Sequence, residues 1–101
     1  MTPEKRVQNS IVQYLKSLEN RGLKVYYERR QAGGFSYKKG IADLYAIING
    51  VHLEIEVKRP GGSLSVMQEK WKDKCNALGI CWLCAESVED VKSYLVDNCM
   101  I

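Results

Sequence analysis

Apolar and polar residues alternate along residues 41–58, on both sides of an Asn49-Gly50 pair. An Asn-Gly pair between two apolar-rich runs predicts a β-hairpin, because both residues of its tight turn must accept a positive φ. A two-residue turn fixes the register and brings Asp43 opposite Glu56. Because side chains alternate between the two faces of a strand, one face of the hairpin is apolar and is expected to face the core: Ala42, Leu44, Ala46, Ile48, Val51, Leu53, Ile55 and Val57.

The opposite face of the hairpin is largely polar and carries Asp43, Tyr45, Glu54, Glu56 and Lys58. Directly opposed residues have Cβ atoms about 4.5–5.5 Å apart, and like charges placed there destabilise a sheet. The pairing of Asp43 with Glu56 therefore predicts a divalent cation between them, since hard cations favour carboxylate oxygen. Each acid taken alone is also typical of an exposed strand surface, with Lys58 as a solvated counter-charge. We expect Glu54 to lie on the surface or to support the site.

Apolar residues at helical spacing predict three helices around this hairpin. The first begins at Thr2, a capping hydroxyl that precedes a proline, and ends at Gly22. Ser65 and Gln68 form a capping-box pattern that opens the second, and Ser87 caps the third. The stripes expected to face inward are Val7, Ile11, Tyr14, Leu15 and Leu18; Met67, Trp71, Cys75 and Leu78; and Val88, Val91, Tyr94 and Leu95.

Two further strands complete the predicted architecture. Residues 24–30 alternate in polarity, whereas residues 80–85 form a continuous apolar run, as expected of a strand buried on both faces. Residues 31–40, with three glycines and two lysines, predict a mobile loop. The element order is then α-β-β-β-α-β-α. Because a helix connects the hairpin to the last strand, we expect an α/β fold with a mixed sheet flanked by helices.

Length and composition limit the class of protein. With 101 residues, 46% hydrophobic, the chain is expected to form one domain, 1–101, with its own core. No apolar run approaches the roughly 20 residues that span a bilayer, and the first residues lack the layout of a signal peptide. We therefore expect a cytoplasmic protein with no membrane partner. We expect no structural zinc, because Cys81 and Cys84 would point to opposite faces of a strand and His52 is the only histidine.

The net charge of +3 is mild, but the basic residues are grouped near the acidic pair. Arg29, Arg30, Lys38 and Lys39 flank or lie within the glycine-containing loop, and Arg59 follows the second hairpin strand. This grouping favours a phosphate backbone as partner, contacted without reading of sequence. Any one of these residues could equally be a solvated surface charge.

Asp43, followed on the next strand by Glu56-Val57-Lys58, resembles the signature of the PD-(D/E)XK nuclease superfamily, and more closely the VRR-NUC domain. That family also has an early helical glutamate, a glycine-containing lead into the aspartate, and a glutamine that opens the next helix. The matching positions here are Glu4, Gly40-Ile41-Ala42-Asp43-Leu44 and Gln68. The resemblance covers almost the whole chain in the right order. It departs at Ala42, where many relatives have proline, which affects local stiffness more than chemistry.

The resemblance implies a restriction-endonuclease-like fold and metal-dependent hydrolysis of phosphodiester bonds. Asp43, Glu56 and the backbone carbonyl of Val57 would hold Mg²⁺ or Mn²⁺. Lys58 would orient the attacking water and offset charge on the phosphorane. The family pattern also assigns site roles to Glu4 and Gln68. Glu4 could instead be an acid that the helix dipole favours, and Gln68 has a capping role in any case.

Stand-alone members of this family, many from bacteriophages, resemble dimeric Holliday-junction resolvases, whereas larger eukaryotic relatives act on flaps. The stand-alone comparison predicts a homodimeric endonuclease acting on branched DNA in a bacterial or phage-infected cytosol. Trp82, Met100 and Ile101 are the expected interface residues. The alternatives are a non-catalytic nucleic-acid-binding module with the same fold, a flap or restriction-type nuclease, and a purely structural metal site.

Overall fold

The structure is a computed structural model that describes residues 1–30 and 40–101. Most of the expected loop, with Lys38 and Lys39, lies outside the described residues. The element order confirms the prediction: α1 (Pro3–Asn20), β1 (Val25–Arg29), β2 (Leu44–Ile48), β3 (Val51–Val57), α2 (Val66–Ala77), β4 (Cys81–Ala85) and α3 (Val88–Asp97).

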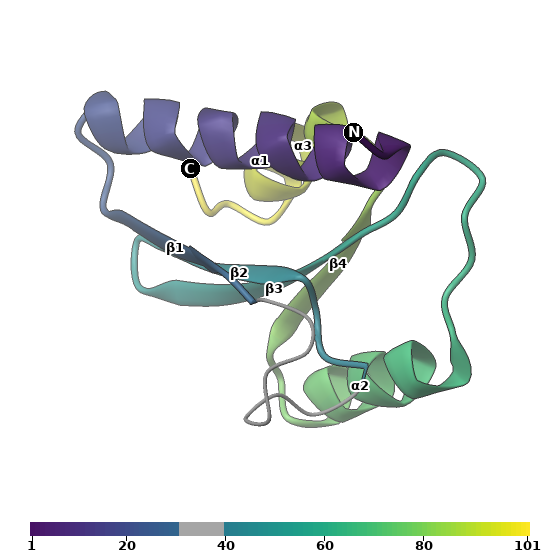
Figure 1. Cartoon of the computed structure of the whole chain (residues 1–101). Coiled ribbons are helices and arrows are strands. Elements are labelled where there is room, and N and C mark those ends of the chain that lie inside the picture. The colour runs from purple at the N-terminus through teal and green to yellow at the C-terminus, as the bar shows by residue number, and fades with distance from the viewer. Residues whose placement is uncertain (31–39) are drawn as a thin grey trace.

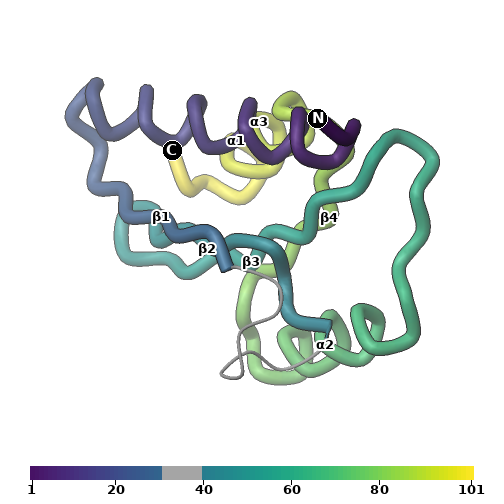
Figure 2. Tube along the Cα trace, viewed as in Figure 1, coloured from purple at the N-terminus to yellow at the C-terminus, as the bar shows by residue number. Residues whose placement is uncertain are grey.

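The four strands form one mixed sheet in the order β1-β2-β3-β4. The first three strands are antiparallel, and β4 runs parallel to β3 because α2 provides the crossover between them. Helices α1 and α3 cover one face of the sheet, and α2 lies on the other (Figure 1). The trace in Figure 2 shows the long connection that leaves β3 and reaches α2 on that second face. The α/β class and the mixed, helix-flanked sheet are as predicted.

The hairpin has the predicted register, from Ile48 opposite Val51 to Leu44 opposite Ile55. Its turn residues Asn49 and Gly50 have φ values of 51° and 85°, as the tight turn requires. The apolar face packs under α1 and α3. The fully buried side chains of this core include Ile11, Leu15, Leu18, Leu44, Ile48, Leu53, Ile55, Val91 and Leu95.

Several apolar residues do not lie where periodicity placed them. Val51 is exposed because it adjoins the hairpin turn. Residues 81–84 are only half-buried, because β4 is an edge strand. Met67 and Leu78 are exposed because α2 turns Trp71 and Cys75 toward the sheet. Met100, expected at an interface, is buried in the core with 4% of its surface exposed.

The helix starts are set by the predicted caps. Thr2 Oγ1 accepts a hydrogen bond from the backbone N–H of Lys5, and Ser87 caps α3 in the same way through Asp90. Ser65 and Gln68 form both hydrogen bonds of a capping box at the start of α2. None of the helices described is long and apolar enough to cross a membrane.

Candidate functional site

Asp43 lies directly before β2, where the regular pairing of the hairpin stops. Its Oδ2 accepts a hydrogen bond of 2.9 Å from the backbone N–H of Val57, and its own carbonyl accepts one of 2.8 Å from Arg30 N–H. The carboxylate thus continues the β2-β3 ladder by one step. These bonds hold the half-buried Asp43 side chain beside β3, on the face that also carries Glu56.

Glu56 is an acid buried in the middle layer of the protein, with 2% of its surface exposed. Its Oε1 accepts a hydrogen bond of 2.7 Å from Gln68 Nε2 and lies 4.0 Å from Lys58 Nζ. Its Oε2 is also buried, yet it finds no hydrogen-bond partner among the described residues. A buried carboxylate oxygen without a partner carries an unfavourable desolvation cost, so this atom is suited to accept a further ligand.

The two carboxyl groups disfavour each other's ionised form. Burial, followed by the charge of Asp43, raises the pKa of Glu56 to about 8. Burial also raises the pKa of Asp43, and the nearby charge of Glu4 acts in the same direction. Lys58 opposes both shifts without cancelling them. The pair therefore carries its full negative charge at neutral pH only if a further positive charge compensates it.

This donor set fits a divalent cation of the Mg²⁺ type. Mg²⁺ is commonly bound by one or two carboxylates and keeps several of its waters, and Asp43 and Glu56 provide two such groups on one face. The partnerless oxygen of Glu56 is the structural observation that favours a cation here. Within the described ranges, no group of three or more histidine, cysteine, aspartate or glutamate side chains is arranged to hold a metal.

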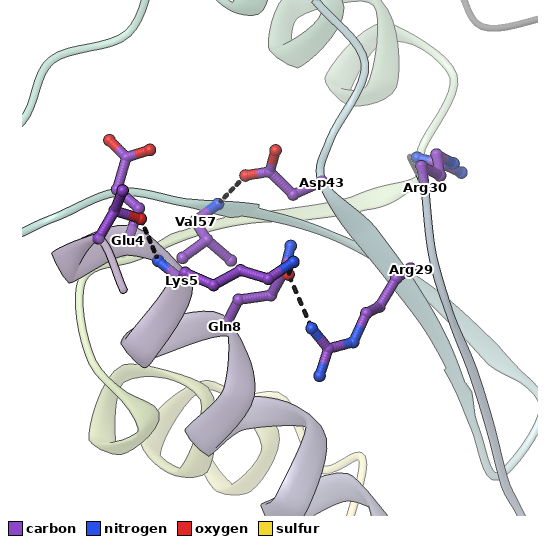
Figure 3. Close-up of a pocket in the computed structure, with 8 residues that line it drawn as sticks. Glu4, Lys5, Gln8, Arg29, Arg30, Asp43 and Val57 are labelled. Carbon is purple, nitrogen blue, oxygen red and sulfur yellow. Dashed lines mark hydrogen bonds between the residues drawn. The ribbon is translucent and has the colours of Figure 1, made fainter. Parts of the chain in front are cut away.

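Glu4 lies at the start of α1, on the rim of a pocket of about 400 Å³. Asp43 and Val57 line the same pocket, so the early glutamate and the hairpin aspartate share one opening (Figure 3). The remaining walls come from α1 and the end of β1: Thr2, Lys5, Gln8, Arg29 and Arg30. The structure thus places Glu4 near enough to act electrostatically on Asp43.

Gln68 combines its capping role with a contact to the acidic pair. Its Oε1 accepts from the backbone N–H of Ser65, which leaves Nε2 directed at Glu56. The capping box therefore fixes the orientation of the amide. One side chain thus makes both the capping hydrogen bond and the contact to Glu56.

The predicted phosphate contacts fall in different surroundings. Arg29 lines the pocket, and its Nη1 donates to Gln8 Oε1 at 3.0 Å and to Asn9 Oδ1 at 2.9 Å. Arg30 instead pairs with Glu54. Arg59 is exposed beyond the end of β3. Arg29 and Arg30 both line the pocket, but the guanidinium of Arg29 donates to neutral amide oxygens, whereas that of Arg30 is paired with a carboxylate.

Of the two positions expected for Glu54, on the surface or in support of the site, the first is wrong. The side chain is not on the surface: it is 2% exposed and accepts hydrogen bonds from Arg30, from Trp71 Nε1 at 3.1 Å and from His52. Tyr45 stacks on the His52 ring, with centroids 5.0 Å apart. Alternation placed Glu54 on the polar face, but two of the donors that allow its burial, Arg30 and Trp71, come from distant parts of the chain.

No family model matches the sequence, and a search of curated proteins found no match. A solved structure titled "VRR_NUC domain" is similar to this chain with a TM-score of 0.76, at 21% sequence identity. The similarity covers 96% of this chain and 97% of that one. The protein therefore has the VRR_NUC fold, with its mixed four-stranded sheet between helices. This confirms the fold that the sequence resemblance implied.

Proposed function

We propose that the protein is a divalent-metal-dependent endonuclease that hydrolyses phosphodiester bonds in DNA. The observation that carries the proposal is the pairing of half-buried Asp43 with buried Glu56, in which one oxygen of Glu56 has no hydrogen-bond partner in the described chain. Its VRR_NUC fold and the resemblance of its motifs to a nuclease family point in the same direction.

The residues of the site have separate tasks in this proposal. Asp43 and Glu56, with the backbone carbonyl of Val57, hold Mg²⁺ or Mn²⁺, and Glu4 supports the site from the pocket rim. When bound, the cation would polarise a phosphoryl oxygen and make it easier to form hydroxide from water. Gln68 fixes the carboxylate of Glu56. Its hydrogen bond of 2.7 Å supports this role.

Lys58 places a positive charge beside the acidic pair. Its ammonium lies 4.0 Å from Glu56 Oε1, and its side chain is 14% exposed. A lysine with a long stem and a compact charge can orient the attacking water through a hydrogen bond. The same charge offsets the negative charge that develops on the phosphoryl oxygens.

We propose DNA as the substrate, contacted at its phosphates by Arg29 and Arg59, and by Lys38 and Lys39, which lie outside the described residues. The preferred form in this proposal is branched DNA, with a four-way junction first and a flap second. A two-fold homodimer suits that task, because two sites can nick opposing strands symmetrically. Exposed Ile101 and half-buried Trp82 are the proposed interface residues.

The test is cleavage of labelled junction, flap, nicked and linear DNAs with Mg²⁺ or Mn²⁺. We expect cleavage of branched DNA that is lost on chelation. Lys58→Ala should lower the rate about 10²–10³-fold while binding of the junction persists, because the charge that it removes acts in the transition state. Binding without cleavage by the wild type in either metal contradicts the enzyme and supports the non-catalytic module. Cutting of linear duplex at one sequence supports a restriction-type nuclease instead.

The dimer is tested separately by light scattering. We expect a mass of twice the chain at micromolar concentration, and Ile101→Asp should shift the population toward monomer. A wild-type monomer under conditions that support junction cleavage would overturn the proposed dimer, without affecting the chemistry of the site.

A further inference from the structure

Two consecutive arginines at the end of β1 point to opposite faces of the sheet. Arg29 reaches toward Gln8 of α1, and Arg30 is directed away from it (Figure 3). The partners of Arg29 are neutral amide oxygens. Arg30 meets a carboxylate instead: its Nη1 and Nη2 donate to the two oxygens of Glu54 at 2.5 and 2.8 Å. The charge of Arg30 is therefore compensated within the protein, whereas no carboxylate among the described residues pairs with Arg29.

The pair of Arg30 and Glu54 is buried and geometrically defined. The side chains are 15% and 3% exposed, and the contact is bidentate, which fixes both position and orientation. Burial on its own raises the pKa of Glu54, but the hydrogen bonds from Arg30 and His52 outweigh it and hold the pKa below its usual value. The Tyr45 ring packs 4.8 Å from the guanidinium carbon. Burying two charges costs desolvation free energy, which an arginine that is only a solvated surface charge would not require. The fixed geometry of the pair suits it to hold the neighbouring backbone in place.

The same arginine is attached to the segment that carries Asp43. Its backbone N–H donates to Asp43 O at 2.8 Å, and its Nη1 donates to Ala42 O at 3.2 Å. Glu54, at the other side of the guanidinium, belongs to the middle of β3, two residues before Glu56. Arg30 thus connects the residues that lead into β2 with the strand that carries the second acid.

We propose that Arg30 and Glu54 are positioning residues that hold the Asp43 carboxylate in place for the divalent cation, and that Arg30 does not contact DNA phosphates. This inference rests on the proposed function. It replaces the phosphate-binding role that the sequence suggested for Arg30 and leaves that role with Arg29. Groups that orient metal ligands through hydrogen bonds typically change metal affinity about 10–100-fold when they are removed.

The test measures Mn²⁺ affinity by calorimetry and, separately, affinity for a labelled four-way junction in EDTA. In Arg30→Lys the charge remains but the bidentate contact is lost, so we expect Mn²⁺ affinity to fall about tenfold or more, with DNA affinity unchanged. The double variant Arg30→Gln/Glu54→Gln leaves no buried charge unpaired and should show the same loss. Arg29→Gln is the matched control, in which DNA affinity falls and Mn²⁺ affinity does not.

If Arg30 instead binds DNA phosphates, the variants should change the affinities for DNA and Mn²⁺ differently. Arg30→Lys would then keep most of the DNA affinity and all of the Mn²⁺ affinity, and the double variant would lose DNA affinity. That pattern overturns the inference while the proposed function stands. Circular dichroism confirms that each variant is folded, and if Arg30→Lys fails to fold, the double variant decides between the two patterns. If wild-type protein binds no Mn²⁺, the proposed function fails, and the inference fails with it.

Discussion

At the scale of single residues, the site depends on two neighbouring acids, of which Glu56 is buried and Asp43 is half-buried. Asp43 and Glu56 could be paired from the sequence because a two-residue turn leaves only one register for the hairpin. The surroundings of Glu54 could not be predicted in this way. Its donors Arg30 and Trp71 lie 24 and 17 positions away, so only tertiary packing brings them to the carboxylate.

The raised pKa of Glu56 makes the free energy of unfolding depend on pH. Between the ordinary value of 4.5 and about 8, the folded protein binds a proton that the unfolded chain has released. The free energy of unfolding of the metal-free protein should therefore fall as pH rises through this window. Urea unfolding between pH 5 and about pH 8 measures the effect. Glu56→Gln should flatten the dependence, and saturating Mn²⁺ should reduce it by replacing the proton.

The expected fall in the free energy of unfolding with rising pH comes from Glu56 and not from Glu54, the other buried acid of the same face. The pKa of Glu54 is lowered, so its contribution to stability is lost only as pH falls below the ordinary range of a glutamate. A free energy of unfolding that rises between pH 5 and pH 8, or a slope in Glu56→Gln as steep as that of the wild type, would contradict the raised pKa of Glu56.

At the scale of the elements, α2 brings a capping residue to the site. Ser65→Ala removes one hydrogen bond of the capping box, and Gln68→Ala removes another together with the contact to Glu56. Both substitutions should lower the free energy of unfolding by about 1 kcal/mol through the lost cap. Only Gln68→Ala should also weaken Mn²⁺ binding. Equal Mn²⁺ affinities in the two variants would show that the glutamine serves the helix alone.

Gly40 holds the segment before Asp43 against the first turn of α2. Its φ is +87°, and a Cβ there would lie 2.4 Å from the carbonyl oxygen of Met67. Gly40→Ala should therefore lower the free energy of unfolding by more than the roughly 1–3 kcal/mol of backbone strain alone. Gly79→Ala is the matched control: its φ is +74°, and the added Cβ would meet no described atom within 4 Å. Equal losses of stability in thermal melts would contradict the contact.

The face of α2 that points toward the sheet could not be predicted from the spacing of its apolar residues. The apolar stripe placed Met67 and Leu78 inward, whereas the helix turns Gln68, Trp71 and Cys75 toward the sheet. A polar group is drawn inward here because buried Glu54 and Glu56 require donors. Helices α1 and α3 face an apolar surface with no such demand, and their stripes were predicted correctly.

At the scale of the whole molecule, the two faces of the sheet have different tasks. One face, under α1 and α3, is an apolar core that stabilises the fold. The other carries the acids, and α2 covers it with Gln68 and Trp71 rather than with a continuous apolar stripe. The pocket opens at the end of the sheet, where α1, β1 and the hairpin meet (Figure 3).

If Asp43 and Glu56 together hold one divalent cation, anomalous diffraction from crystals soaked in Mn²⁺ will locate it between them. We expect a single strong peak within about 2.0–2.6 Å of a carboxyl oxygen of both residues. The peak should be absent in Asp43→Asn crystals treated in the same way. A peak bound elsewhere, or none between these carboxylates at Mn²⁺ concentrations that support cleavage, would contradict a cation shared by Asp43 and Glu56.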